Sequence, residues 1–183
     1  RCCVSGAGSA SGFGVSGPTA SVVVAVYNQM RELELVLAAL AAQSDLAFDV
    51  ILADDGSMPP AAQLAERLAP SLPFAVRPVW PPDAGFCKAR IQNVAALSTS
   101  SELLIFVDGD CLPFRDLVSV YRRKALPGEF MTGAVVNLGV AASRALTPES
   151  VRAGVHESAL GLLARRNPVG KQWANWWHRG RRQ

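Results

Sequence analysis

The chain has 183 residues, of which 50% are hydrophobic and 18% are charged, and its formal net charge is +3. This length suits one domain with a buried core, and the balance of apolar and charged residues excludes a disordered chain. The small net charge gives no reason to expect a nucleic-acid partner. No apolar run approaches the roughly 18 residues that a membrane span needs.

The start of the chain and its cysteines indicate the compartment. Residues 1–19 are rich in Gly, Ser and Ala and lack the apolar centre of a secretory signal, so we expect a flexible leader. The cysteines (Cys2, Cys3, Cys87 and Cys111) have no C-x-x-C spacing. We therefore expect neither a zinc site nor disulfides, which fits a reducing compartment.

The first predicted strand and helix follow directly. Residues 21–26 are mostly valine and predict a buried strand that ends at Tyr27 and Asn28. From residue 30 to about 42, apolar residues recur every three or four positions, which predicts a helix with one face on the sheet.

A second and a third strand are predicted at residues 48–53 and 74–79. The second ends at acids, in the run Asp54-Asp55-Gly56-Ser57, and a helix opens at the prolines that follow. Residues 80–86 form a loop by their prolines and glycine. A helix is predicted from 87 to about 98, with Ile91, Val94, Ala95 and Leu97 as its buried side.

A run of five apolar residues, 103–107, predicts a buried strand that stops at Asp108-Gly109-Asp110. Beyond it we expect a helix at 114–125, a strand at 129–138 and a helix at 148–166. The last stretch is basic, with three tryptophans between 173 and 177. It either contacts a membrane surface or an acceptor, or is solvated or covered by other parts of the protein.

Strands that alternate with helices at such short intervals predict an α/β fold, with a mostly parallel, Rossmann-like sheet flanked by helices. The carboxyl ends of parallel strands lie at one edge, which is where open α/β sheets bind ligands. The polar ends at Tyr27, at Asp54 and Asp55, and at Asp108 and Asp110 are therefore expected to converge.

Each of these residues has a chemical and a structural interpretation. Asp108 and Asp110 can share a hard cation, Mg²⁺ or Mn²⁺, or can be solvated acids of a turn. Asp54 and Asp55 can accept hydrogen bonds from a nucleobase or ribose, or can cap a helix. Tyr27 can pack on the base or in the core.

Basic and histidine residues are less informative. Lys88 and Arg90 can reach a diphosphate, although basic side chains at a helix start are more often solvated. His156 and His178 have no evident partner and are expected to be structural or exposed. No G-x-x-x-x-G-K-[ST] loop and no G-x-G-x-x-G between a strand and a helix occur, which argues against P-loop enzymes and dinucleotide oxidoreductases.

The order of the motifs resembles the amino-terminal half of family 2 glycosyltransferases of the GT-A fold, over about residues 20–140. The motifs are the strand 21–26 with Tyr27-Asn28, the Asp54–Ser57 run, the segment 83–90 and the run 106–111. Arg90 matches the family pattern, whereas Ile91 and Asn93 depart from it.

The resemblance implies roles for these residues. It places Ala25, Tyr27, Asp54 and Asp55 around the base and ribose. Asp108 would lie near the ribose, metal and phosphate, and Asp110 would bind the metal.

The resemblance also implies a function: metal-dependent transfer of a sugar, with inversion, from a nucleotide donor such as a UDP-sugar to a glycan or lipid-linked hydroxyl. The family's acceptor half usually lies further along, so we expect residues 141–183 to be a helical, partial acceptor region with a basic aromatic tail. The fold would then be incomplete at its carboxyl end. Neither Glu149 nor Glu157 lies in a motif that would mark the general base.

Two alternatives remain open. The chain could be a donor-binding remnant without turnover. It could also be a phosphohydrolase with Asp108 as nucleophile and Asp110 as acid and base. Cys111 then stands where such enzymes usually have Thr or Val, and Asp54 and Asp55 have no role.

Overall fold

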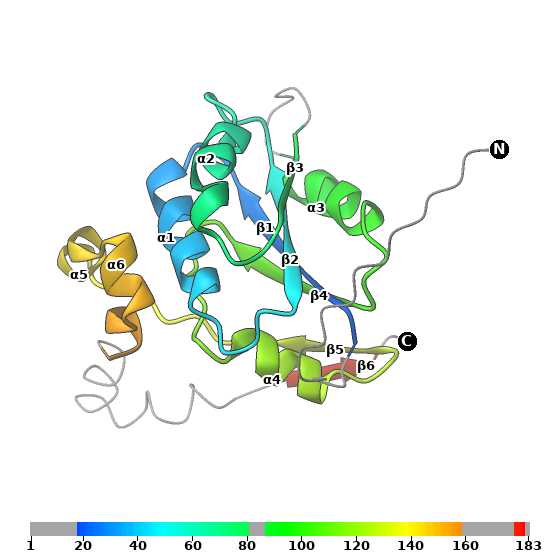
Figure 1. The fold of residues 1–183 in the computed structure, drawn as a ribbon. Helices are drawn as coiled ribbons and strands as arrows, with labels where there is room; N and C mark the ends of the chain where they lie inside the picture. Colours follow the sequence, from blue (N-terminus) through cyan, green and yellow to red (C-terminus); the bar gives the residue numbers. More distant parts are fainter. Residues whose placement is uncertain (1–17, 81–86, 159–177, 182–183) are drawn as a thin grey trace.

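The computed structural model describes residues 18–80, 87–158 and 178–181. At its centre is a four-stranded parallel sheet in the order β3-β2-β1-β4, with helices on both faces (Figure 1). Its strands are β1 (Ala20–Val26), β2 (Phe48–Asp54), β3 (Val76–Val79) and β4 (Leu103–Asp108). The predicted parallel α/β sheet is confirmed.

Some helices connect these strands, and others follow the last strand of the sheet along the chain. Those between strands lie close to their predicted positions, and the helix before β3 continues into a short 3₁₀ turn. They are α1 (Met30–Ala41), α2 (Ala61–Leu68), η1 (Ala69–Ser71), α3 (Lys88–Leu97), α4 (Leu117–Lys124), α5 (Val140–Ala145) and α6 (Pro148–Arg152).

The alternating side chains of β1 divide the core into two layers. Val22 and Val24 lie in the cluster that α1 and α2 cover, whereas Val23 packs with Ile91 and Ala95 of α3 on the other face. Figure 1 shows α1 and α2 on one side of the sheet and α3 on the other. Because β1 is buried on both faces, its sequence is a continuous apolar run rather than an alternating one.

Two predictions of burial are wrong. Phe106 in β4 is 51% exposed, and Val94 and Leu97 on α3 are 44% and 87% exposed. The reason is the position of β4 at the edge of the sheet. Helix α3 packs over β1, β2 and β3 through Ile91 and Ala95, which leaves the outer face of β4 open.

The later part of the chain differs most from the predictions. Strand β5 (Glu129–Thr132) ends six residues earlier than the predicted 129–138, and it pairs antiparallel with an unexpected strand, β6 (His178–Arg181). Helices α5 and α6 lie in the region predicted to be helical, but α6 ends at Arg152, short of the predicted 148–166, because the chain turns at Gly154, which has a φ of 80°. The leader up to residue 17, the predicted helix beyond residue 158 and the tryptophans at 173–177 lie outside the described residues.

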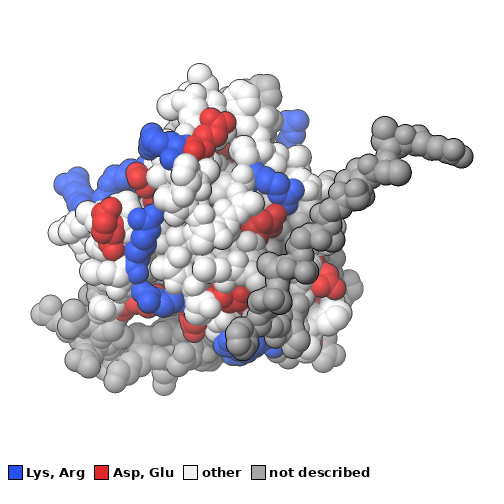
Figure 2. Space-filling view, viewed as in Figure 1, with Lys and Arg blue, Asp and Glu red and all other residues white. Residues whose placement is uncertain are grey.

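Charges on the visible face are mixed. Figure 2 shows acidic and basic side chains interspersed over this face rather than gathered into one large patch of a single sign. Within the part of the chain that the structure describes, no helix combines the length and the apolar character needed to cross a bilayer.

Candidate functional site

The end of β1 holds the two acid-bearing turns beside it. The carbonyl oxygen of Ala25 accepts a hydrogen bond from Gly109 N at 2.7 Å, and that of Val26 accepts one from Asp55 N at 2.9 Å. Ala25 is also the register partner of Asp108 on β4. The structure therefore brings the polar ends of β1, β2 and β4 together at one edge of the sheet.

Gly109 makes this approach close. A Cβ atom at this position would lie 2.9 Å from the Ala25 carbonyl oxygen and 3.1 Å from Cβ of Val26. Real Cβ atoms do not approach a backbone oxygen so closely, so a side chain at 109 would push the β4 turn away from β1. Glycine thus sets the position of Asp108 and Asp110 relative to β1.

Asp54 is fully buried, and both of its carboxylate oxygens accept backbone hydrogen bonds. Ser57 N donates to Oδ1 at 2.9 Å, and Ala61 N, at the start of α2, donates to Oδ2 at 2.7 Å. This arrangement orders the turn and satisfies an N–H group at a helix start. A contact between Asp54 and a nucleoside stays a prediction.

Asp55 lies next to it and faces the start of α3. Its Oδ2 accepts a hydrogen bond from Cys87 N at 2.8 Å, and the residue is 6% exposed. Its Oδ1 accepts no hydrogen bond from the described residues. Asp55 therefore anchors the start of α3 at this edge through one oxygen.

Of the two basic residues on α3, one joins the acids. Lys88 Nζ lies 2.6 Å from Asp108 Oδ1, and both side chains are partly exposed. Arg90 is exposed and forms no hydrogen bond or ion pair with the described residues. The two residues stand about 200° apart around the helix, which explains why only one of them reaches β4.

Three side chains after β4 could hold a cation. The ligand atoms of Asp108, Asp110 and Cys111 lie within 4.8 Å of one another. Burial, and then the negative charges of Asp110 and Asp108, raise the pKa of Cys111 to about 11, so its thiol stays protonated at neutral pH. Two carboxylates beside a neutral thiol suit a hard cation such as Mg²⁺ or Mn²⁺.

Residues after β1 form a second link between loops. Tyr27 is 45% exposed at this edge, and Asn28 has a φ of 53°, a conformation that asparagine tolerates. Asn28 N donates to Ser57 Oγ at 2.9 Å, and its Oδ1 accepts from Met58 N at 2.9 Å. These reciprocal bonds fasten the loop after β1 to the loop after β2.

Neither acid near α6 has the surroundings of a general base. Hydrogen bonds from its own backbone and from Thr147 hold the pKa of the exposed Glu149 carboxyl below its usual value, which makes it a weaker base. Glu157 Oε1 accepts a hydrogen bond from Arg115 N at 2.6 Å. His156 is buried with Nε2 3.2 Å from the Pro113 carbonyl oxygen, which is a structural position.

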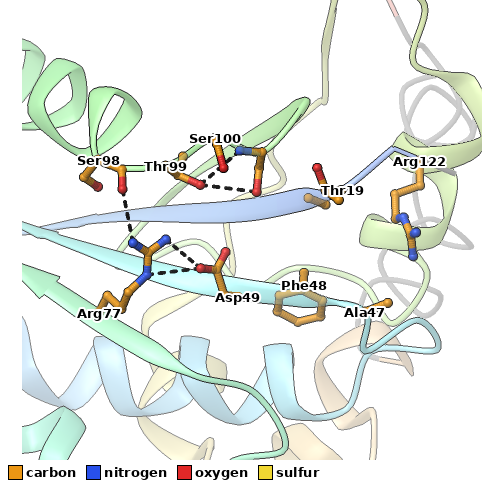
Figure 3. A pocket seen from close by; sticks show the side chains of 11 residues that line it. Thr19, Ala47, Phe48, Asp49, Arg77, Ser98, Thr99, Ser100 and Arg122 are labelled. Carbon is orange, nitrogen blue, oxygen red and sulfur yellow. Dashed lines mark hydrogen bonds and ion pairs between the residues drawn. The ribbon is translucent and has the colours of Figure 1, made fainter. Parts of the chain in front are cut away.

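A hollow of about 520 Å³ lies at the opposite, amino-terminal edge of the sheet. Figure 3 shows Asp49 and Arg77 paired within it, with Arg77 also bonded to Ser98. On its far side Arg122 is ion-paired with Asp45, and both of these side chains are almost completely buried. Its charged side chains therefore neutralise one another, and the hollow does not contain the converging acids.

Sequence reasoning identified the acids but not how they are held. It missed the ion pair of Lys88 with Asp108, the bond from Cys87 N to Asp55 and the third ligand candidate, Cys111. The position of Lys88 at the start of a helix next to the sheet edge was the one indication available. A backbone donor such as Cys87 N leaves no trace in a sequence.

Comparisons with solved structures identify the fold. A mannosyltransferase from Pyrobaculum calidifontis, in complex with GDP-Man and Mn²⁺, matches 67% of this chain at 24% identity and a TM-score of 0.57. TarS from S. aureus matches 56% of the chain at 26% identity and a TM-score of 0.48. Its 1–349 form in complex with UDP-GlcNAc matches 56% of the chain at 27% identity and a TM-score of 0.47. The parallel sheet with its flanking helices is of the GT-A type.

The match to these structures is partial. The aligned part spans 37% of the mannosyltransferase chain and 18% and 29% of the two TarS chains. No curated protein matches the sequence. The model of the family described as glycosyl transferase family 2 matches residues 21–126, which include the strand ends, Lys88, Asp108 and Asp110. Since this match covers more than half of the 183 residues, the chain belongs to glycosyl transferase family 2.

Proposed function

We propose that the chain binds a nucleoside diphosphate sugar, linked to UDP, at the carboxyl edge of its sheet. Asp108 and Asp110 would hold Mn²⁺ or Mg²⁺, which supplies positive charge to the diphosphate leaving group. The observation that carries this proposal is the convergence of Asp108, Asp110 and Asp55 around the end of β1. Family membership favours it over the phosphohydrolase alternative.

The nucleoside would lie over the ends of β1 and β2. Asp55 Oδ1 would accept from the N–H of the uracil ring, because both oxygens of Asp54 are already bonded to the backbone. Tyr27, which is exposed, would pack against the base, and Ala25 would line the site below it. Asp54 would then act indirectly, by shaping the turn that presents Asp55.

The diphosphate would lie between α3 and the end of β4. Lys88 is already within reach of Asp108. Its ammonium group can pair with the oxygens of a phosphate as well as with those of a carboxylate. Arg90 is exposed on a different side of α3 from Lys88. It would therefore contact a part of the donor other than the phosphate that Lys88 binds. These placements account for each residue of the predicted donor site.

The reaction we propose is a single displacement with inversion, in which a glycan or lipid-linked hydroxyl attacks the anomeric carbon on the cytoplasmic side of the cell. The mannosyltransferase of the same fold is described with GDP-Man and Mn²⁺, which is the same class of donor and cation. Asp108 and Asp110 would orient the leaving group for this displacement.

The proposal is tested by calorimetric titration of UDP into the protein, with and without Mn²⁺. We expect binding that requires Mn²⁺ and that is lost in Asp110→Ala. Asp116→Ala is the matched control, because it removes an exposed carboxylate that precedes α4 and lies outside the site. Equal binding of UDP by Asp110→Ala, or no binding by the unaltered protein, would contradict the proposal.

A further inference from the structure

The ion pair between Lys88 and Asp108 occupies part of the proposed cation site. Lys88 Nζ lies 2.6 Å from Asp108 Oδ1, and Asp108 is one of the three residues whose ligand atoms lie within 4.8 Å of one another. A lysine ammonium is a compact positive charge with three donors. In this arrangement it already partly neutralises a carboxylate that a divalent cation would bind.

Lys88 is held in this position by the fold. It is the first residue of α3, and the N–H of the preceding residue, Cys87, donates to Asp55 at 2.8 Å. The start of α3 is therefore fixed to the end of β2. Asp108 is held beside β1, because it pairs with Ala25 in the parallel sheet. Two anchored elements bring this pair together, unlike an ion pair between two mobile surface chains.

A lysine here and a divalent cation compete for the same carboxylate. An ammonium beside Asp108 repels an incoming cation, and the cation must replace the lysine as a partner of Asp108. A diphosphate changes this balance, because its oxygens offer the ammonium another anionic partner. The cation and the diphosphate would then favour each other's binding.

We propose that Lys88 is a placeholder cation, which pairs with Asp108 while the site is empty and moves to the diphosphate when the donor and the divalent cation bind. The inference rests on the proposed function and deepens it. It assigns Lys88 a positioning role and makes the two binding events interdependent: the cation binds weakly alone and tightly with the nucleotide. Arg90, which has no contact with the acids, does not share this role.

The test is the affinity for Mn²⁺ alone, measured from the electron paramagnetic resonance of free Mn²⁺. Lys88→Met removes the competing charge, so we expect Mn²⁺ to bind up to about fivefold more tightly than to the unaltered protein, the limit set by a partly exposed ion pair. Lys88→Gln should behave in the same way, and Lys88→Arg should keep weak binding. Arg67→Met, which removes an exposed charge on α2, is the control and should change the affinity by less than about twofold.

A second arm repeats the titration with UDP present. In the unaltered protein UDP should strengthen Mn²⁺ binding, and in Lys88→Met the strengthening should be smaller, because the lysine no longer has to be displaced. Circular dichroism verifies that each variant is folded. Unchanged or weaker Mn²⁺ binding by both Lys88→Met and Lys88→Gln would overturn the inference.

The two arms separate this inference from the proposed function. If UDP does not bind to the unaltered protein, the proposed function fails, whatever the variants do with Mn²⁺ alone. If UDP binds with Mn²⁺ but the lysine variants do not bind Mn²⁺ more tightly, only the placeholder role fails. Absence of any Mn²⁺ binding by the unaltered protein and the variants alike, at millimolar concentration, also overturns the placeholder role, and binding of UDP with Mn²⁺ then decides on the proposed function.

Discussion

The carboxylates at the two edges of the sheet have different partners. At the amino-terminal edge, Asp49 is bonded to Arg77, and Asp45 is bonded to Arg122. At the carboxyl edge, Asp55 accepts from a backbone N–H, Asp108 is paired with Lys88, and Asp110 forms no ion pair with the described residues. The two acids of the first edge are each paired with an arginine, whereas the described part of the second edge has more acids than bases. We infer that the first edge stabilises the fold and the second is available for a cationic ligand.

The largest expected effect comes from the buried ion pair at the amino-terminal edge. Asp45 and Arg122 have side chains only 8% and 7% exposed, and Arg122 Nη1 lies 2.8 Å from Asp45 Oδ2. Asp45→Ala should lower the free energy of unfolding by about 3–5 kcal/mol, because the guanidinium loses its carboxylate in a buried setting. Urea denaturation measures this. A loss below about 1 kcal/mol would show that the pair does not support the fold.

The second largest loss of stability is expected at Asp54, a buried carboxylate of the carboxyl edge whose two oxygens both accept hydrogen bonds from the backbone. Asp54→Asn replaces one of its two accepting oxygens with a donor, so the bond from either Ser57 N or Ala61 N is lost. We expect a loss of about 2 kcal/mol in the free energy of unfolding.

Asp55→Asn is the matched comparison for Asp54→Asn. It can still accept from Cys87 N through its remaining oxygen, so it should cost less than about 1 kcal/mol. Both values come from the same urea titrations. Equal losses in the two variants would remove the distinction between a structural Asp54 and a ligand-facing Asp55.

A smaller effect is expected for the exposed pair of the amino-terminal edge. Arg77 Nη2 lies 2.7 Å from Asp49 Oδ2, with the two side chains 46% and 28% exposed. Arg77→Met should lower the free energy of unfolding by up to about 1 kcal/mol, and 1 M NaCl should reduce the difference, because water and salt screen such a pair. A difference that does not change with salt would mean that the effect comes from packing of the arginine stem.

The smallest effect on stability is expected where the proposed effect on binding is largest. Asp110 is exposed, and its one hydrogen bond within the described residues is the weak one from the Cys111 thiol. Asp110→Asn should change the free energy of unfolding by less than about 0.5 kcal/mol. The same variant should lose the Mn²⁺-dependent binding of UDP in calorimetry. A loss of stability above about 1 kcal/mol would place Asp110 with the structural acids instead.

The sequence predicted the sheet well because its signals were local. Strands β1, β2 and β4 are short, largely apolar runs that stop at polar residues, so both the parallel order and the shared edge followed from chain direction. Burial was predicted less well. Phe106 and Leu97 are apolar, but which neighbours cover them depends on β4 being the edge strand. That order depends on tertiary pairing.

The same limit applies to the site and to the carboxyl-terminal region. The strand β5 is only four residues long where a run of ten was predicted, and its partner β6 lies some fifty residues further along the chain. Asp54 and Asp55 are neighbours of one residue type, yet one is fully buried against backbone N–H groups and the other faces α3. Only the three-dimensional direction of each side chain distinguishes them.

The link between Asn28 and the loop after β2 has a consequence for the thermodynamics of ligand capture. Because Asn28 N binds Ser57 Oγ and Asn28 Oδ1 binds Met58 N, the two loops are joined before a nucleotide arrives. Little conformational entropy then has to be lost on that side of the site when the nucleotide binds. In the proposed complex, the half of the site that would bind the base is therefore preorganised, and Lys88 would exchange one anionic partner for another.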